Sequence, residues 1–148
     1  MTTECSLRDI TDGDIEWLYE LHEQSYRDVV VRQFGSWDES FQRDWFDRKW
    51  QKDRPARIIT IKDDAIGVVV LEHKYDHDWL YEILIEADHR AQGVGSSLMK
   101  QFIANARAQN RPLRLQVLHE NDRAKRFYEN LGFVVQKNLE NHYLMEID

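Results

Sequence analysis

The segment Arg90-Ala91-Gln92-Gly93-Val94-Gly95 joins an apolar strand pattern, Leu80–Ile85, to a helix pattern that begins directly behind it. Glycines between a strand and a helix let the backbone approach a ligand closely, and the free N–H groups of the first helical turn point at it. Such a turn is an anion site, and Ser96 and Ser97 add hydroxyl donors to it. The helix pattern consists of apolar residues at helical spacing: Leu98, Met99, Phe102, Ile103 and Ala106.

The glycine spacing excludes two common phosphate-binding loops. A dinucleotide-binding fingerprint needs a third glycine where this chain has Leu98. A P-loop ends in Gly-Lys-Ser or Gly-Lys-Thr, and the segment contains neither. The anion site must therefore belong to another class.

Arg-x-x-Gly-x-Gly after a strand resembles the pyrophosphate loop of the GCN5-related N-acetyltransferases (GNAT), which hold acetyl-coenzyme A. A second segment, Asn121 to Phe133, resembles the second motif of the same family, one helix and one strand later. Asn121 suits the N-cap of this helix and Gly132 the position after its end. A capped amphipathic helix needs no ligand, so this motif supports the family only together with the first.

The charge distribution fits a polyanionic ligand on one half of the chain. The net charge is −7, which argues against nucleic-acid binding in general. Residues 90–126 carry two acidic and eight basic side chains, whereas residues 1–89 carry 21 acidic and 11 basic ones. The acidic half would favour a cationic second substrate, although it could also be ordinary solvated surface.

The length of 148 residues fits one domain, residues 1–148, and no linker or repeat divides it. The longest apolar run, Ile66–Leu71, is too short to cross a bilayer, so no membrane association is expected. Cys5 is the single cysteine, and no signal peptide is visible, which together favour the cytoplasm. We expect a monomer or a homodimer.

The element pattern gives an α/β chain with a mixed sheet and the order β-α-α-β-β-β-α-β-α-β-β, which matches the GNAT fold. The expected strands are Leu7–Ile10, Arg57–Ile61, Ala65–Glu72, Trp79–Ile85, Leu113–Leu118, Phe133–Lys137 and His142–Ile147. A helix from Asp14 to Val29 is capped by Thr11 or Asp12, and a second helix carrying Phe41, Trp45, Phe46 and Trp50 starts at Ser36 or Asp38.

The resemblance assigns the cofactor residues. The strand before the loop should bulge and splay from its neighbour, so that the pantetheine arm binds the backbone of Ile83, Leu84 and Ile85. Arg90, Ala91, Gln92, Gly93, Val94, Gly95 and Ser96 would form the pyrophosphate loop. Asn121 matches a cofactor-contacting asparagine, but it could serve as an N-cap alone.

The resemblance also assigns the chemistry, which is direct attack of an amine on the bound thioester. Tyr128 matches the general acid that protonates the departing thiolate. Glu82 on the central strand is one candidate base. Strand alternation turns its side chain to the opposite face unless the bulge redirects it. In many relatives the acid stands one residue earlier, where this chain has Tyr81. His119 is the rival base because imidazole titrates in the right range.

Aromatic and acidic residues between the two N-terminal helices are candidates for the acceptor pocket. We expect Tyr26, Trp37 and Asp38 to line it, although packing of the two helices would also explain them. Residues 73–78 offer nitrogen and oxygen donors, but no other ligand pattern accompanies them, so no metal is expected.

The sequence therefore predicts an acetyl-CoA-dependent N-acetyltransferase that acts on a small cationic amine. The alternatives are an acetyltransferase for protein N-termini or lysines, and a non-catalytic sensor that binds acyl-CoA.

Overall fold

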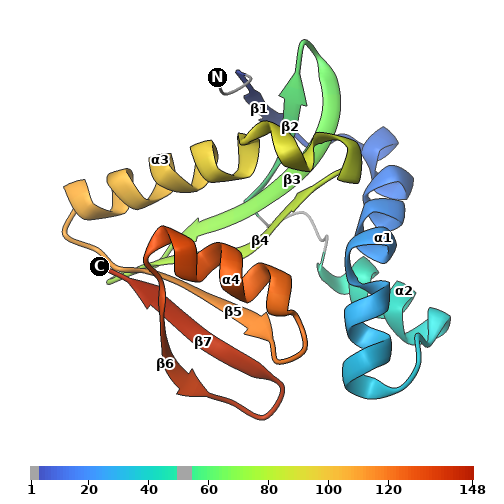
Figure 1. The fold of residues 1–148 in the computed structure, drawn as a ribbon. Coiled ribbons are helices and arrows are strands. Elements are labelled where there is room, and N and C mark those ends of the chain that lie inside the picture. The colour runs from blue at the N-terminus through green and yellow to red at the C-terminus, as the bar shows by residue number, and fades with distance from the viewer. Residues whose placement is uncertain (1–3, 50–54) are drawn as a thin grey trace.

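One seven-stranded mixed sheet carries four helices on its two faces in the computed structural model, which describes residues 4–49 and 55–148 (Figure 1). The strands are β1 (Ser6–Asp9), β2 (Ala56–Ile61), β3 (Asp64–His73), β4 (Asp78–Ile85), β5 (Leu113–Leu118), β6 (Val134–Asn138) and β7 (His142–Ile147). The helices are α1 (Ile15–Phe34), α2 (Glu39–Lys49), α3 (Val94–Ala108) and α4 (Asp122–Leu131), with short 3₁₀ turns at Asp12–Asp14 and Ala87–Gln92.

The strands lie in the order β1-β2-β3-β4-β5-β7-β6. Among the described strands, β4 and β5 are the one parallel pair, and α3 connects them because a parallel pair needs a crossover. The element order is the one that the sequence predicts, and the mixed α/β fold is confirmed.

Each face of the sheet has its own apolar core. The larger core lies under α3 and α4, where the predicted helical stripe is buried: Leu98, Met99, Phe102, Ile103 and Ala106. The smaller core lies under α1 and α2, with Leu18, Leu21 and Phe46 at its centre. Burial of each such side chain contributes about 1.5–3 kcal/mol, so both helix layers are held to the sheet by packing.

α1 is longer than the sequence indicates. The predicted end was Val29, but the helix continues to Phe34 and ends at Gly35, whose φ of +93° gives a left-handed cap. Val29 and Val30 are buried, so packing outweighs the weak helix propensity of valine. The strand boundaries coincide with the predicted ones or shift by one residue, and Trp50 lies outside the described residues.

The start of α1 is fixed by a capping arrangement around Asp14. The Asp14 carboxylate accepts hydrogen bonds from the Thr11 backbone N–H, at 2.8 Å, and from the Thr11 hydroxyl, at 3.0 Å. Two nitrogens of Arg8 donate to the same carboxylate at 2.8 and 2.9 Å, which ties β1 to the helix. These hydrogen bonds hold the pKa of Asp14 well below its usual range, and the bond from Arg8 has the largest effect.

Gly67 on β3 lies directly against the backbone of β4. A Cβ atom on this residue would lie 2.3 Å from the carbonyl oxygen of Leu84 and 3.2 Å from Cα of Ile85. Only a residue without a side chain fits here, and the position faces the end of β4 that leads into the glycine loop.

No helix in residues 4–49 or 55–148 combines the length and the apolar composition that a bilayer span requires.

Candidate active site

The glycine loop ends at the N-terminus of α3. Gly93 caps this helix with a φ of +77°, a conformation that favours glycine. The first hydrogen bond of the new turn runs from the Ser97 N–H to the Gly93 carbonyl, at 3.0 Å. The N–H groups of residues 94–96 precede it and point out of the helix end, which is the arrangement that binds anions.

Gly95 keeps the space beside this turn open. A Cβ atom on Gly95 would lie 3.3 Å from Cδ1 of Ile85 and 3.6 Å from the ring of Phe127. A larger side chain would therefore have to push into β4 or α4, or fill the space in front of the helix end. We call Gly93–Gly95 the cradle; Gly95 lies against the apolar side chains of Ile85 on β4 and Phe127 on α4.

Two guanidinium groups lie beside the cradle. Arg90 donates from Nε to the backbone carbonyl of Ile85 at 2.9 Å, which folds the loop back onto the end of β4. Partial burial lowers the pKa of Arg90, and the nearby charge of Arg123 at the start of α4 lowers it further. Two cations placed this close together favour an anion between or beside them.

A bulge in β4 decides which way its side chains point. Leu80 pairs with Leu71 of β3 and Glu82 pairs with Val70, so Tyr81 is an extra residue on β4. Leu80 consequently packs in the core under α3 and α4, whereas Leu84 packs in the core under α1. The bulge turns Glu82 toward the α1 face, whereas regular strand alternation would place it on the opposite face.

The sheet splits just beyond this bulge. The parallel pairing of β4 and β5 ends at Leu80 and Leu115, although the strands continue to Ile85 and Leu118. The expected bulge and splay of the central strand are therefore confirmed. Residues 83–85 still pair with β3 on one side but present their other edge to the split, where an extended ligand can pair with the backbone.

Tyr26, Glu82 and Tyr128 meet at this split from three different elements. Burial raises the pKa of Tyr26 well above its usual value, and the nearby charge of Glu82 raises it further. Burial also raises the pKa of Tyr128, and the Glu82 charge again adds to the effect. Both phenols are protonated at neutral pH, on either side of one 4% exposed carboxylate.

A row of rings leads from Tyr26 toward the surface between α1 and α2. The His22 ring lies 5.2 Å from the Tyr26 ring and 5.7 Å from that of Trp37, measured between centroids. His22 is buried, and its Nε2 is 3.1 Å from Oε1 of Gln42 on α2. His22 was not among the expected site residues, because nothing local in the sequence reveals the rings that surround it.

The carboxylate that meets Trp37 is Glu39. The Trp37 indole donates to Glu39 at 3.0 Å, and the Tyr19 hydroxyl donates to it at 2.6 Å. These hydrogen bonds lower the pKa of Glu39, and the bond from Tyr19 has the larger effect. Asp38 instead accepts a hydrogen bond from the Phe41 N–H at 3.0 Å and is exposed, so it acts as the N-cap of α2.

Asn121 and His119 also have structural partners. The Asn121 side chain accepts from the Ala124 N–H at 3.3 Å, and α4 ends at Gly132 with a φ of +109°, as the capping pattern predicts. The His119 ring packs on Tyr143, with 4.6 Å between centroids, and its backbone N–H donates to the Asn141 carbonyl at 3.1 Å. His119 thus lies just after β5, beside the turn that precedes β7.

The donors in residues 73–78 belong to an ion-pair network. Asp78 is buried, and its Oδ1 contacts Arg111 Nε at 3.0 Å and His73 Nδ1 at 2.8 Å. Arg111 also donates to the carbonyls of Tyr75 and His77, at 2.9 and 2.8 Å. These contacts hold the connection between β3 and β4 against the start of β5.

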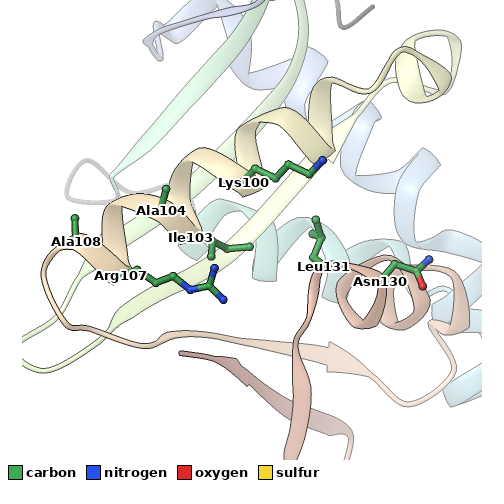
Figure 2. A pocket seen from close by; sticks show the side chains of 7 residues that line it. All are labelled: Lys100, Ile103, Ala104, Arg107, Ala108, Asn130 and Leu131. Atoms are coloured by element: carbon green, nitrogen blue, oxygen red, sulfur yellow. The ribbon is translucent and has the colours of Figure 1, made fainter.

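A groove of about 660 Å³ lies between α3 and α4, away from this site (Figure 2). Figure 2 shows Ile103 and Leu131 on its two sides, one from each helix. Lys100 and Arg107 also line the groove, and Arg107 is twelve residues beyond Gly95, or about 18 Å along the helix. The groove is therefore separate from the Tyr26–Glu82–Tyr128 cluster.

Comparisons with known proteins point to one family. A model of the acetyltransferase (GNAT) family matches residues 16–133. N-alpha-acetyltransferase 30 of Homo sapiens is 22% identical over 165 aligned positions, which cover 100% of this chain and 45% of that protein. An uncharacterized N-acetyltransferase of Methanocaldococcus jannaschii is 26% identical over 141 positions, which cover 86% of this chain and 60% of that protein.

A solved structure extends the likeness to the whole fold. The PaiA N-acetyltransferase of Thermoplasma acidophilum, crystallised in complex with coenzyme A, superposes with a TM-score of 0.76 at 18% identity. The match covers 97% of this chain and 98% of that one. In contrast, the chain spans only about half the length of the two curated relatives that it matches.

Proposed function

The chain belongs to the GNAT family of acetyltransferases, and on that premise we propose that it transfers the acetyl group of acetyl-CoA directly to the amine of a small cationic molecule. The observation that carries the proposal is the meeting of Tyr26, Glu82 and Tyr128 at the split between β4 and β5. The cradle at Gly93–Gly95 adjoins the same split through Ile85.

Acetyl-CoA fits the cradle as a co-substrate. The N–H groups of residues 94–96 would bind the pyrophosphate, with Arg90 and Arg123 neutralising its charge. The free edge of residues 83–85 would pair with the pantetheine arm, and an N–H on that edge would stabilise the oxyanion. Bound in this way, acetyl-CoA supplies an activated thioester at the split.

The two ionisable groups at the split have complementary roles. Glu82 would accept the proton of the incoming amine, directly or through one water, so that the nitrogen lone pair can attack the thioester carbon. As the carbon–sulfur bond breaks, the electron pair goes to sulfur and Tyr128 protonates the thiolate. Burial keeps Tyr128 protonated until that moment, because it raises the pKa of the phenol.

The acceptor would arrive from the α1 and α2 face, since Glu82 points to that face. Trp37 and Glu39 together offer an aromatic ring and a carboxylate that stays ionised, a combination that binds cations. Tyr26 then lies between this entrance and Glu82. The location of these groups is the reason to favour a cationic amine.

A protein N-terminus is the second candidate acceptor. It is favoured by the likeness to N-alpha-acetyltransferase 30, whose name states that activity. An α-amine at the end of a chain is also a cation, so the charge at Trp37 and Glu39 suits both classes.

Thiol release from acetyl-CoA, measured with amino-acid amides, polyamines, aminoglycosides and short peptides, tests the proposal. Tyr128→Phe should lower kcat by roughly 10²–10⁴-fold and leave acetyl-CoA affinity unchanged. Tyr75→Phe is the matched control, because Tyr75 is 99% exposed. Equal rates for Tyr128→Phe and wild type would remove Tyr128 from the chemistry, and acetyl-CoA binding without amine-dependent thiol release would indicate a sensor.

A further inference from the structure

Glu86 lies at the junction of the cofactor loop and the acceptor-side helix. It follows β4 directly and precedes the 3₁₀ turn Ala87–Gln92, which leads into the cradle. Its backbone N–H donates to the Ile66 carbonyl at 2.8 Å, and its carbonyl accepts from the His89 N–H at 2.9 Å. Glu86 is therefore held on β3 and at the same time begins the turn.

The two carboxylate oxygens of Glu86 face different elements. Oε1 accepts a hydrogen bond from the Trp17 indole, near the start of α1, at 2.7 Å. Oε2 lies 3.8 Å from Nδ1 of His89 in the 3₁₀ turn. One side chain thus joins α1 to the cofactor loop, and Figure 1 shows the β4–α3 connection beside the start of α1. We call Trp17, Glu86 and His89 the Glu86 bridge.

Both partners of this carboxylate are enclosed by the fold. The Trp17 ring packs against the core under α1 and α2. Nδ1 of His89 is buried and has no hydrogen-bond partner in residues 4–49 and 55–148, so Glu86 is the acidic group that holds it. A hydrogen bond to a charged group is strong, and shielding from water strengthens it further. The bridge is therefore a firm connection between the helix and the loop.

Each end of the bridge continues into the proposed site. On the loop side, the residue after His89 is Arg90, whose Nε donates to the Ile85 carbonyl at 2.9 Å. On the helix side, Tyr26 follows Trp17 by nine residues, or about 13.5 Å along α1. A helix packed on a sheet moves as one rigid element, so a shift at Trp17 also shifts Tyr26.

We propose that Glu86 is a positioning residue that couples the two binding regions. When a pyrophosphate group fixes the loop, the bridge fixes α1 and, with it, Tyr26 beside Glu82. The coupling is reciprocal, so loss of the Trp17 contact on the acceptor side weakens cofactor binding. The inference rests on the proposed function, because it takes the cradle as the acetyl-CoA site and α1 as the acceptor-side helix.

Hydrogen exchange of the whole chain, with and without coenzyme A, tests the coupling. In wild type, saturating coenzyme A should slow exchange at the loop and also in residues 15–22, the first turns of α1, by about fivefold. Glu86→Ala and Trp17→Phe should keep the slowing at the loop and lose it in α1, because the bridge is broken. A merely structural role of Glu86 would change overall stability but leave the slowing in α1 in place.

Calorimetry with coenzyme A gives the reciprocal measurement. Trp17→Phe should raise the Kd by about fivefold, although Trp17 lies on the side of Glu86 away from the cradle. The double variant should raise the Kd no more than Glu86→Ala alone, because both changes remove the same contact. Glu86→Gln should stay within about twofold of the wild-type Kd, since its amide oxygen still accepts from the indole.

Two controls match these variants. Trp45→Phe changes a tryptophan of α2 that is 47% exposed, and Glu140→Ala changes an exposed glutamate. Both should show the wild-type Kd and the wild-type slowing in α1. Thermal unfolding shows that each variant is folded.

No slowing in α1 of wild type, its persistence in Glu86→Ala, or additive effects of the two substitutions on the Kd would overturn the bridge. The proposed function fails separately, if the coupling is found but no amine promotes thiol release. If wild type binds no coenzyme A, the cofactor site is wrong, and the bridge is tested without ligand. Trp17→Phe should then speed exchange in residues 87–92 by about fivefold, and an unchanged rate would overturn the bridge.

Discussion

Gly67→Ala should destabilise the protein strongly, because the added Cβ would lie 2.3 Å from the Leu84 carbonyl oxygen. Real Cβ atoms do not approach within 3.0 Å of another heavy atom, so the β3 and β4 backbones must separate by about 0.7 Å. Overpacking against a rigid backbone costs about 3 kcal/mol, which lowers the Tm of a 148-residue chain by roughly 10 °C. Calorimetry of the wild type and of Gly67→Ala at the same pH measures the shift in Tm.

Gly13→Ala is the matched control for this experiment. A Cβ on Gly13 meets only the Thr11 hydroxyl oxygen, at 3.8 Å, which is an ordinary contact. The substitution should therefore leave Tm unchanged or raise it by up to about 3 °C, because alanine restricts the unfolded chain. A Tm for Gly67→Ala within 2 °C of the control would refute the reasoning about the strand contact. Movement of Leu84 and Ile85 should also weaken acetyl-CoA binding, a loss that the control should not show.

Three further predictions concern individual side chains. Asp14→Asn should lower the free energy of unfolding by about 1 kcal/mol near pH 7. The difference from wild type should disappear as the pH falls below about 4, because the pKa of Asp14 is lowered only in the folded protein. Urea unfolding at several pH values measures this difference. Gly95→Asp should abolish acetyl-CoA binding in calorimetry, since it places a side chain and a negative charge in the cradle, whereas unchanged affinity would exclude the loop as the cofactor site. Asp38→Ala should destabilise α2 by about 1 kcal/mol, whereas Asp38→Asn should not, and equal stability of the two would remove the N-cap role.

Local signals predicted the parts of the site that depend on local structure. The glycine loop, the caps at Asn121 and Gly132 and the stripe of α3 follow from the spacing of a few neighbouring residues. Such features form wherever the same short segment folds, so a single sequence is enough to find them. The boundaries of the sheet strands were within two residues for the same reason.

Long-range contacts decided the rest. The orientation of Glu82 depends on a bulge that forms only when β4 pairs with β3, and no feature of residues 80–82 by themselves reveals it. Gln33 on α1 forms hydrogen bonds with residues that are 87 and 108 positions away. Likewise, Asp38 and Glu39 are adjacent in sequence, but only the packing of Tyr19 shows which of them meets Trp37 and which caps a helix.

The bulge at Tyr81 makes the position of the candidate base a matter of residue count rather than residue type. Deleting Tyr81 would remove the bulge, and Glu82 would then follow Leu80 in ordinary strand alternation, which keeps the carboxylate on the α1 face. An unbulged strand of the present length would instead place Glu82 on the same face as Leu80, toward the apolar core under α3. The face of the base therefore depends on whether the extra residue is accommodated as a bulge, and not on which side chain that residue carries. Homologous strands that carry their acid one position earlier can present it at the same point in space, so an ungapped alignment would pair functionally different residues.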